Sequence, residues 1–224
     1  MHGASGDPEW SRLLLVEGVP GVGKSTLLDG LLRRHVAERP PRKLRTVLHL
    51  TQAHTYGPLA PAEDAGTLGR AEALAHLESV VSLLEWHVRA LTAERTPKLF
   101  ALVDTLHLTH CHRPGVLGWD DVAPLDARLA GIGCKLIFLR AARSTLLERG
   151  VLGREGTDFA RYAARRWGAT SEQLHRGLVE EQRAMEAHLG RTRLVHRVLD
   201  VDGPLEGCVE EAYRFWIGVG APVR

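Results

Sequence analysis

The chain has 224 residues, with 29 basic and 27 acidic side chains and a formal net charge of +2. Apolar residues make up 44% and charged residues 25%, which is typical of a globular domain and excludes a disordered chain, a collagen-like repeat and a coiled coil. The balanced charge argues against nucleic acid held by bulk charge. Only four basic residues are lysines, against 25 arginines, so a lysine inside a motif stands out from the composition.

Three well-separated cysteines with no CxxC pair indicate a reducing compartment. No apolar run approaches the roughly 18 residues of a membrane span, so we expect no membrane partner. Residues 1–10 lack the layout of a secretory signal and are expected to form a flexible leader. Residues 11–224 are expected to form a single domain in the cytoplasm.

Short apolar runs alternate with longer segments of helical period, which predicts an α/β domain with a parallel sheet. Strands are expected at residues 13–16, 46–50, 99–103, 136–139 and 198–201. Helices are expected from about residue 25, over 74–91, over much of 143–189 and over 204–216. Residues 52–66, rich in Pro, Gly, Ala and Asp, predict a long functional loop. The pattern does not give the order of the strands.

The segment between the first strand and its helix, Gly18-Val-Pro-Gly-Val-Gly-Lys-Ser25, matches the G-x-x-x-x-G-K-[ST] phosphate loop. Its glycines permit positive φ and let backbone N–H groups surround a phosphate, and the following helix adds its positive dipole end. Lys24 is expected to reach the β- and γ-phosphates, and the Ser25 hydroxyl to bind Mg²⁺. The expected contacts of the nucleotide are Gly18, Gly21, Val22, Gly23, Lys24, Ser25 and Thr26.

Asp104 follows five apolar residues of the third strand, the position of a Walker-B-type carboxylate. Ligands of open α/β sheets bind at the carboxyl ends of the strands, so Asp104 is expected to face the phosphate loop and bind the metal with Ser25. Asp104 is also the first candidate for a catalytic base, with Glu63 and Asp64 as second choices. The alternative is an aspartate that only caps the turn.

These segments resemble the P-loop nucleoside and nucleotide kinases, thymidylate kinase in particular. Val16-Glu17-Gly18, running into the phosphate loop, looks like the family's opening. Residues 139–149 resemble its passage from the fourth strand into the lid, and residues 199–205 its last strand and adenine loop. The resemblance spans about residues 12–216. It implies a three-layer fold with five parallel strands, a mobile helical lid over about 149–168, ATP as the donor, and Asp202 as a nucleotide contact.

Two departures concern the acceptor. The family usually carries an Asp-Arg pair after the third strand, whereas Asp104 is followed by Thr-Leu-His. It also carries an Arg-Glu-Pro-type segment after the second strand, whereas residues 50–56 read Leu-Thr-Gln-Ala-His-Thr-Tyr. The donor side therefore looks intact and the acceptor side rewritten, which predicts a substrate other than dTMP.

Five arginines gather in the stretch that the resemblance assigns to the lid: Arg149, Arg154, Arg161, Arg165 and Arg166. Phosphoryl transfer depends on cations that neutralise the transferred group, so the cluster is expected to close over the phosphates. Arg149 and Arg154, which flank a glycine-containing loop, are the preferred catalytic pair. The alternative is a solvated helix face in an arginine-rich chain.

His107, His110 and His112 crowd the segment after Asp104, together with Cys111. Acceptor contact or proton transfer by His107 or His110 is one interpretation, and a set of polar loop histidines is the other. Zinc is less favoured, because no second ligand pair stands at structural-zinc spacing.

Gln52, His54 and Tyr56 are expected to contact the acceptor, and Trp86 and Trp119 are candidate walls, although each aromatic is more often ordinary packing. The sequence as a whole predicts a Mg-ATP-dependent kinase of a nucleoside, a nucleotide or an antibiotic-like alcohol. The alternatives are a regulatory or assembly NTPase and a nucleotide-binding module without phosphotransfer. A small-molecule acceptor is the expected partner, and a homodimer is left open.

Overall fold

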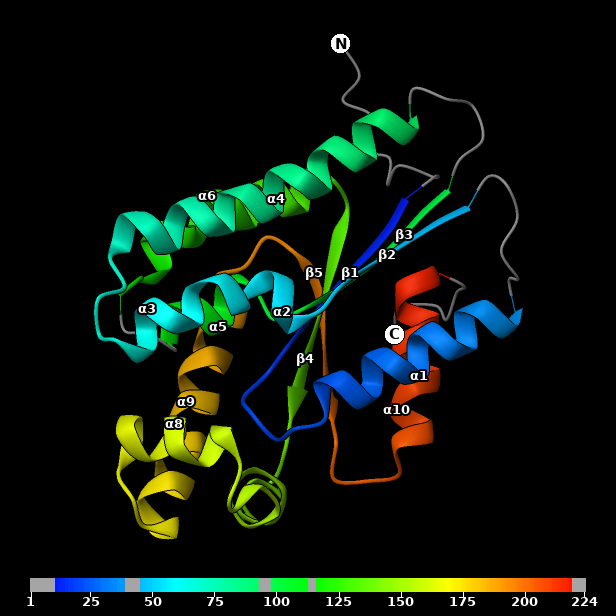
Figure 1. The fold of residues 1–224 in the computed structure, drawn as a ribbon. Coiled ribbons are helices and arrows are strands. Elements are labelled where there is room, and N and C mark those ends of the chain that lie inside the picture. The colour runs from blue at the N-terminus through cyan, green and yellow to red at the C-terminus, as the bar shows by residue number, and fades with distance from the viewer. Residues whose placement is uncertain (1–10, 39–44, 93–97, 113–115, 219–224) are drawn as a thin grey trace.

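The structure is a computed structural model that describes residues 11–38, 45–92, 98–112 and 116–218 (Figure 1). The expected leader, residues 1–10, lies outside the described residues. Within them, no helix has the length and apolar character needed to cross a membrane.

Five parallel strands form one sheet in the order β2-β3-β1-β4-β5. The strands are β1 (Ser11–Glu17), β2 (Arg45–Leu50), β3 (Lys98–Asp104), β4 (Cys134–Arg140) and β5 (Val195–Asp200). All five predicted strands are present, so the predicted α/β fold with a five-stranded parallel sheet is confirmed.

Helices cover both faces of the sheet, which makes three layers (Figure 1). α1 (Lys24–Glu38) and α10 (Leu205–Ile217) pack together on one face, and α4 (Arg70–Thr92) and α6 (Trp119–Gly131) on the other. Because both faces are covered, the central strands are continuous apolar runs, and every side chain from Leu13 to Val16 is at most 1% exposed. The sheet is thus a rigid base for the loops at its carboxyl edge.

Residues 52–64 form three short helices: α2 (Gln52–Thr55), η1 (Gly57–Leu59) and α3 (Ala60–Asp64). The prediction of a long loop here was wrong. Pro58 and Pro61 each lie in the first turn of a helix, where the missing N–H costs nothing and the fixed φ favours helix. The predicted histidine loop is likewise a helix, α5 (His107–His112).

Between β4 and β5 the chain is helical over most of residues 143–189, as predicted. The elements are α7 (Arg143–Thr145), η2 (Leu146–Val151), η3 (Leu152–Arg154), α8 (Asp158–Trp167) and α9 (Ser171–Leu189). Thr157 caps α8 by accepting a hydrogen bond from the Ala160 amide, and Thr170 caps α9 in a capping box with Gln173. These caps fix where the two helices begin. In Figure 1, α8 lies to the left of the loop that joins β1 to α1.

Candidate functional site

The phosphate loop, residues 18–25, connects β1 to α1. Gly18, Gly21 and Gly23 have φ values of 145°, 89° and 94°, which L-residues rarely adopt. A Cβ on Gly21 would lie 2.5 Å from the Cα of Gly150, so the loop packs directly against the backbone of η2. The loop therefore has the conformation expected of a phosphate cradle and touches the segment predicted to be a lid.

Lys24 is the first residue of α1, and its ammonium turns back over the loop. Its Nζ donates to the carbonyl oxygens of Gly18 at 2.6 Å and Val19 at 3.1 Å. A phosphate oxygen offers the same hydrogen-bond acceptor chemistry with a full negative charge. Lys24 is thus held at the mouth of the loop, where an anion would meet it.

Asp104 lies beside the loop because β3 is the neighbour of β1, with Val16 paired to Asp104 in the register. The Ser25 hydroxyl donates to Asp104 Oδ2 at 3.5 Å, and the Thr105 hydroxyl donates to Oδ1 at 2.8 Å. Thr105 holds a positive φ of 63°, which turns the chain sharply at the end of β3. The structure therefore brings together the two predicted metal ligands.

One hydroxyl and one carboxylate fit Mg²⁺, which takes few protein ligands and completes its shell with phosphate oxygens and water. Among the described residues, no group of three or more His, Cys, Asp or Glu side chains is placed to hold a metal ion. A metal at the Ser25–Asp104 pair would therefore depend on the oxygens of a bound nucleotide.

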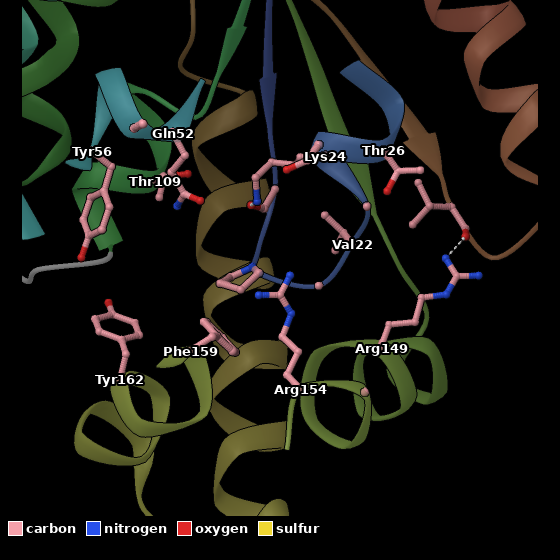
Figure 2. A pocket seen from close by; sticks show the side chains of 18 of the residues that line it. Val22, Lys24, Thr26, Gln52, Tyr56, Thr109, Arg149, Arg154, Phe159 and Tyr162 are labelled. Carbon is pink, nitrogen blue, oxygen red and sulfur yellow. Dashed lines mark hydrogen bonds between the residues drawn. The ribbon is translucent and has the colours of Figure 1, made fainter. Parts of the chain in front are cut away.

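A cavity of about 930 Å³ opens beside the phosphate loop (Figure 2). At one end it is bounded by the loop, Arg149 and the residues after β5, and we call this the donor end. At the other it is bounded by the short helices of residues 52–64, Thr109 of α5 and helix α8, and we call this the acceptor end; both names follow the expectations from the sequence. The acceptor end is lined by Gln52, Ala53, Tyr56, Gly57, Ala60, Asp64, Thr109, Phe159, Tyr162 and Arg165.

All the predicted phosphate-loop contacts line the cavity, but Asp202 does not. Its carboxylate accepts hydrogen bonds from the Ala142 amide, at 2.9 and 3.1 Å, and from the Thr145 hydroxyl at 2.6 Å. Asp202 thus ties the loop after β5 to α7, directly after β4. Its neighbours Val201 and Gly203 line the cavity instead.

Three of the five clustered arginines line the cavity. Arg149 donates to the Val201 carbonyl at 3.0 Å, and the Arg154 guanidinium lies 4.8 Å from the centre of the Phe159 ring. Arg165 pairs with Asp64 at 2.6 Å across the mouth of the acceptor end. The other two, Arg161 and Arg166, are not among the lining residues.

Glu63 and the two tyrosines connect the short helices to α8. The Tyr56 hydroxyl donates to one carboxylate oxygen of Glu63, and the Tyr162 hydroxyl donates to the other at 3.0 Å. Tyr56 and Gln52 line the cavity as predicted, whereas His54 is exposed, bonds to Thr51 and does not line it. In Figure 2 the two tyrosines point their hydroxyl ends toward each other at the acceptor end.

The structure does not bring His107 or His110 to the cavity. His107 is fully buried, with Nε2 3.0 Å from Asp126, and His110 is fully buried, with Nε2 3.1 Å from the Thr55 carbonyl. The helical turn of α5 directs both rings into the protein interior, so the interpretation as acceptor contacts is wrong. Trp86, 63% exposed on α4, and Trp119 do not line the cavity either.

His112 and Trp119 both stack on His188, with ring centres 4.8 and 5.1 Å apart. Burial lowers the pKa of His112 to about 4, with a further contribution from the charge of His188, so its ring is neutral at physiological pH. This stack is packing between helices and not part of the cavity.

The sequence interpretation assigned no role to Glu17 or Thr109. Glu17 is fully buried and accepts hydrogen bonds from the amides of Leu106, at 2.8 Å, and Leu108, at 3.1 Å, and from the Thr109 hydroxyl at 2.5 Å. Burial raises the pKa of Glu17 above its usual value, although these hydrogen bonds oppose the shift. The sequence shows a carboxylate directly before the phosphate loop, but it does not show that Thr109 is its hydrogen-bond partner.

Phe159 and Tyr162 were also missed. They lie three residues apart on α8, which places them on one face of the helix, toward the cavity. Their spacing of three residues could have indicated a shared helix face, but the sequence analysis considered only the arginines around them.

No protein-family model and no curated protein sequence matches the chain. Among solved structures, the fold is similar to the crystal structure of YorR protein from Bacillus subtilis in complex with phosphorylated GDP. The TM-score is 0.52 at 11% sequence identity, over 91% of this chain and 94% of that chain. At this identity the likeness establishes the fold and not the activity. Fold and loop together define an α/β protein of P-loop-like architecture.

Proposed function

We propose that the protein is an ATP-dependent kinase that transfers the γ-phosphoryl group to a small-molecule acceptor. One observation carries the proposal: a single cavity of about 930 Å³ contains both the phosphate loop and a second, aromatic and polar end. Phosphoryl transfer needs donor and acceptor in line within one enclosure. A regulatory NTPase, or a module that only binds nucleotide, has no use for the second end.

Each element of the donor end has a defined task in this proposal. The loop amides and Lys24 bind the β- and γ-phosphates, and Arg149 and Arg154 neutralise the charge on the transferred group. When bound, Mg²⁺ would be held by Ser25 and Asp104 and would supply further charge neutralisation. The lid segment excludes water, so that the acceptor and not solvent receives the phosphoryl group.

ADP release, measured with a panel of nucleosides, nucleotides and aminoglycosides as acceptors, tests the proposal. ATP binding is measured separately by calorimetry. We expect turnover that depends on an acceptor and is abolished by Lys24→Ala. The matched control, Arg33→Ala on the exposed side of the same helix, should leave it unchanged.

Two results would refute the kinase and point to its alternatives. ADP release that no acceptor stimulates would indicate an NTPase. ATP binding without any turnover would indicate a binding module.

A further inference from the structure

Thr109 lies where the two ends of the cavity meet. It is on α5, it lines the cavity, and its hydroxyl donates a hydrogen bond to Glu17, the residue directly before Gly18 of the phosphate loop. Figure 2 shows Thr109 between Tyr56 of the acceptor end and Lys24 of the donor end. A group on the acceptor that reaches the γ-phosphate must therefore pass close to this hydroxyl.

The hydrogen bond to Glu17 fixes what Thr109 can offer the cavity. A threonine hydroxyl has one proton, and here that proton is directed away from the cavity to Glu17 Oε2 at 2.5 Å. The remaining lone pairs of Thr109 Oγ1 accept hydrogen bonds. A substrate group that contacts this oxygen must be a donor, which a hydroxyl is and an ionised phosphate is not.

The charges of residues 52–64 agree with this polarity. Residues 52–64 contain no lysine or arginine and carry two carboxylates, Glu63 and Asp64. The guanidinium of Arg165 is paired with Asp64 at 2.6 Å. A site for an acceptor that is itself a phosphate would be expected to carry several arginines in this segment.

We propose that the acceptor is an alcohol and that Thr109, with Glu17 behind it, receives the proton of the reacting hydroxyl. The inference rests on the proposed kinase function. In the step, the hydroxyl oxygen bonds to the γ-phosphorus while the bond from that phosphorus to the β,γ-bridging oxygen breaks, which gives a phosphate ester and ADP. The hydroxyl proton passes to Thr109 Oγ1 as the Thr109 proton passes to Glu17 Oε2. In this step Thr109 takes the role that the sequence suggested for Asp104, which does not line the cavity. Thr109 is the catalytic residue of the step, and Glu17 is a positioning residue that acts through it.

The surroundings of Glu17 suit it to take up a proton reversibly. Burial raises the pKa of its carboxyl, while the charges of His107 on α5 and Lys24 on α1, together with its hydrogen bonds, lower it. Cys111 also interacts with it, and burial raises the pKa of that thiol to about 12, so it stays neutral. A raised carboxyl pKa makes Glu17 a better base than an ordinary glutamate near neutral pH.

Three variants test the inference by steady-state kinetics with ATP. Thr109→Val removes the oxygen and should lower kcat about 10²-fold or more, whereas Thr109→Ser keeps the oxygen and should stay within about tenfold of wild type. Glu17→Gln can donate to Thr109, which turns the threonine proton toward the cavity. It should lower kcat and remove the acid limb of its pH profile. Thr46→Val, exposed on β2, is the matched control and should change nothing.

Acceptors are offered as matched pairs, each nucleoside beside its 5′-monophosphate and each aminoglycoside beside its phosphate ester. We expect the alcohols to turn over and the phosphates to be at least tenfold poorer. Better turnover of the phosphates, or a Thr109→Val enzyme with wild-type kcat, would overturn the inference and leave the kinase standing. An acid limb that persists in Glu17→Gln would also overturn it. The absence of turnover with any acceptor would instead refute the kinase, and the inference with it.

Discussion

Two alanine substitutions in the phosphate loop should separate backbone strain from contact with the lid segment. Gly21 and Gly23 have nearly the same φ, 89° and 94°. A Cβ on Gly21 would lie 2.5 Å from the Cα and 2.9 Å from the N of Gly150, and backbone atoms cannot rotate away. A Cβ on Gly23 would meet no atom within 4 Å. The two variants thus share the same backbone strain, but only Gly21→Ala adds a steric clash.

The expected costs follow from these geometries. An alanine in the left-handed region costs about 1–2 kcal/mol, and this is the whole penalty for Gly23→Ala. Gly21→Ala adds about 1–3 kcal/mol for overpacking, which gives about 2–5 kcal/mol in total. Urea unfolding of the nucleotide-free protein, followed by circular dichroism, measures both free energies of unfolding. If Gly21→Ala costs no more than Gly23→Ala, the loop does not pack on η2 in the free protein and the reasoning is refuted.

Two further predictions concern titratable side chains. Burial alone would raise the pKa of Asp126, but hydrogen bonds, first that of His107, hold the pKa below its usual value. The ionised Asp126 therefore stabilises the folded protein above about pH 4, and this stabilisation is lost as the pH falls further. Asp126→Asn should therefore lower the free energy of unfolding by about 1–3 kcal/mol at pH 7, and a loss that stays the same at pH 3 would contradict this. Cys208 lines the cavity, so saturating ADP should slow its labelling by a thiol reagent at pH 8, although burial raises the pKa of this thiol as well. Cys111 and Cys134 do not line the cavity, and burial raises their thiol pKa values to about 12, so both should react more slowly than Cys208. A Cys208 labelling rate that ADP does not change would contradict the assigned donor end.

The strands and the conformation of the loop at residues 18–25 could be predicted because each is encoded in a contiguous stretch. Residues 13–16 are apolar without alternation, which only a strand covered on both faces requires. The loop glycines are spaced as a phosphate cradle needs them, and all three adopt positive φ. The strand order was not readable. Once β3 is known to pair with β1, however, the closeness of Asp104 and Ser25 follows from the register.

The histidines of α5 show why residue type alone misleads. His107 and His110 looked like a chemical cluster because they are polar and follow Asp104 in the chain. Whether they face a cavity or the interior depends on the rotation of a six-residue helix, which is too short to show a period. Glu17 helps to fix that rotation by accepting hydrogen bonds from the amides of Leu106 and Leu108. A contact across about 90 residues of sequence therefore decides what the local pattern left open.

The acceptor end, unlike the donor end, also depends on contacts that the local sequence does not show. Three separate segments form it, and their contacts span long distances in the chain: Tyr162 reaches Glu63, and Arg165 reaches Asp64. The chemistry proposed for it depends on the direction of one proton, that of the Thr109 hydroxyl. Glu17 sets this direction by accepting a hydrogen bond from Thr109. Because such a direction depends on the tertiary structure, sequence reasoning could propose a phosphate site but not the kind of acceptor group that would face it.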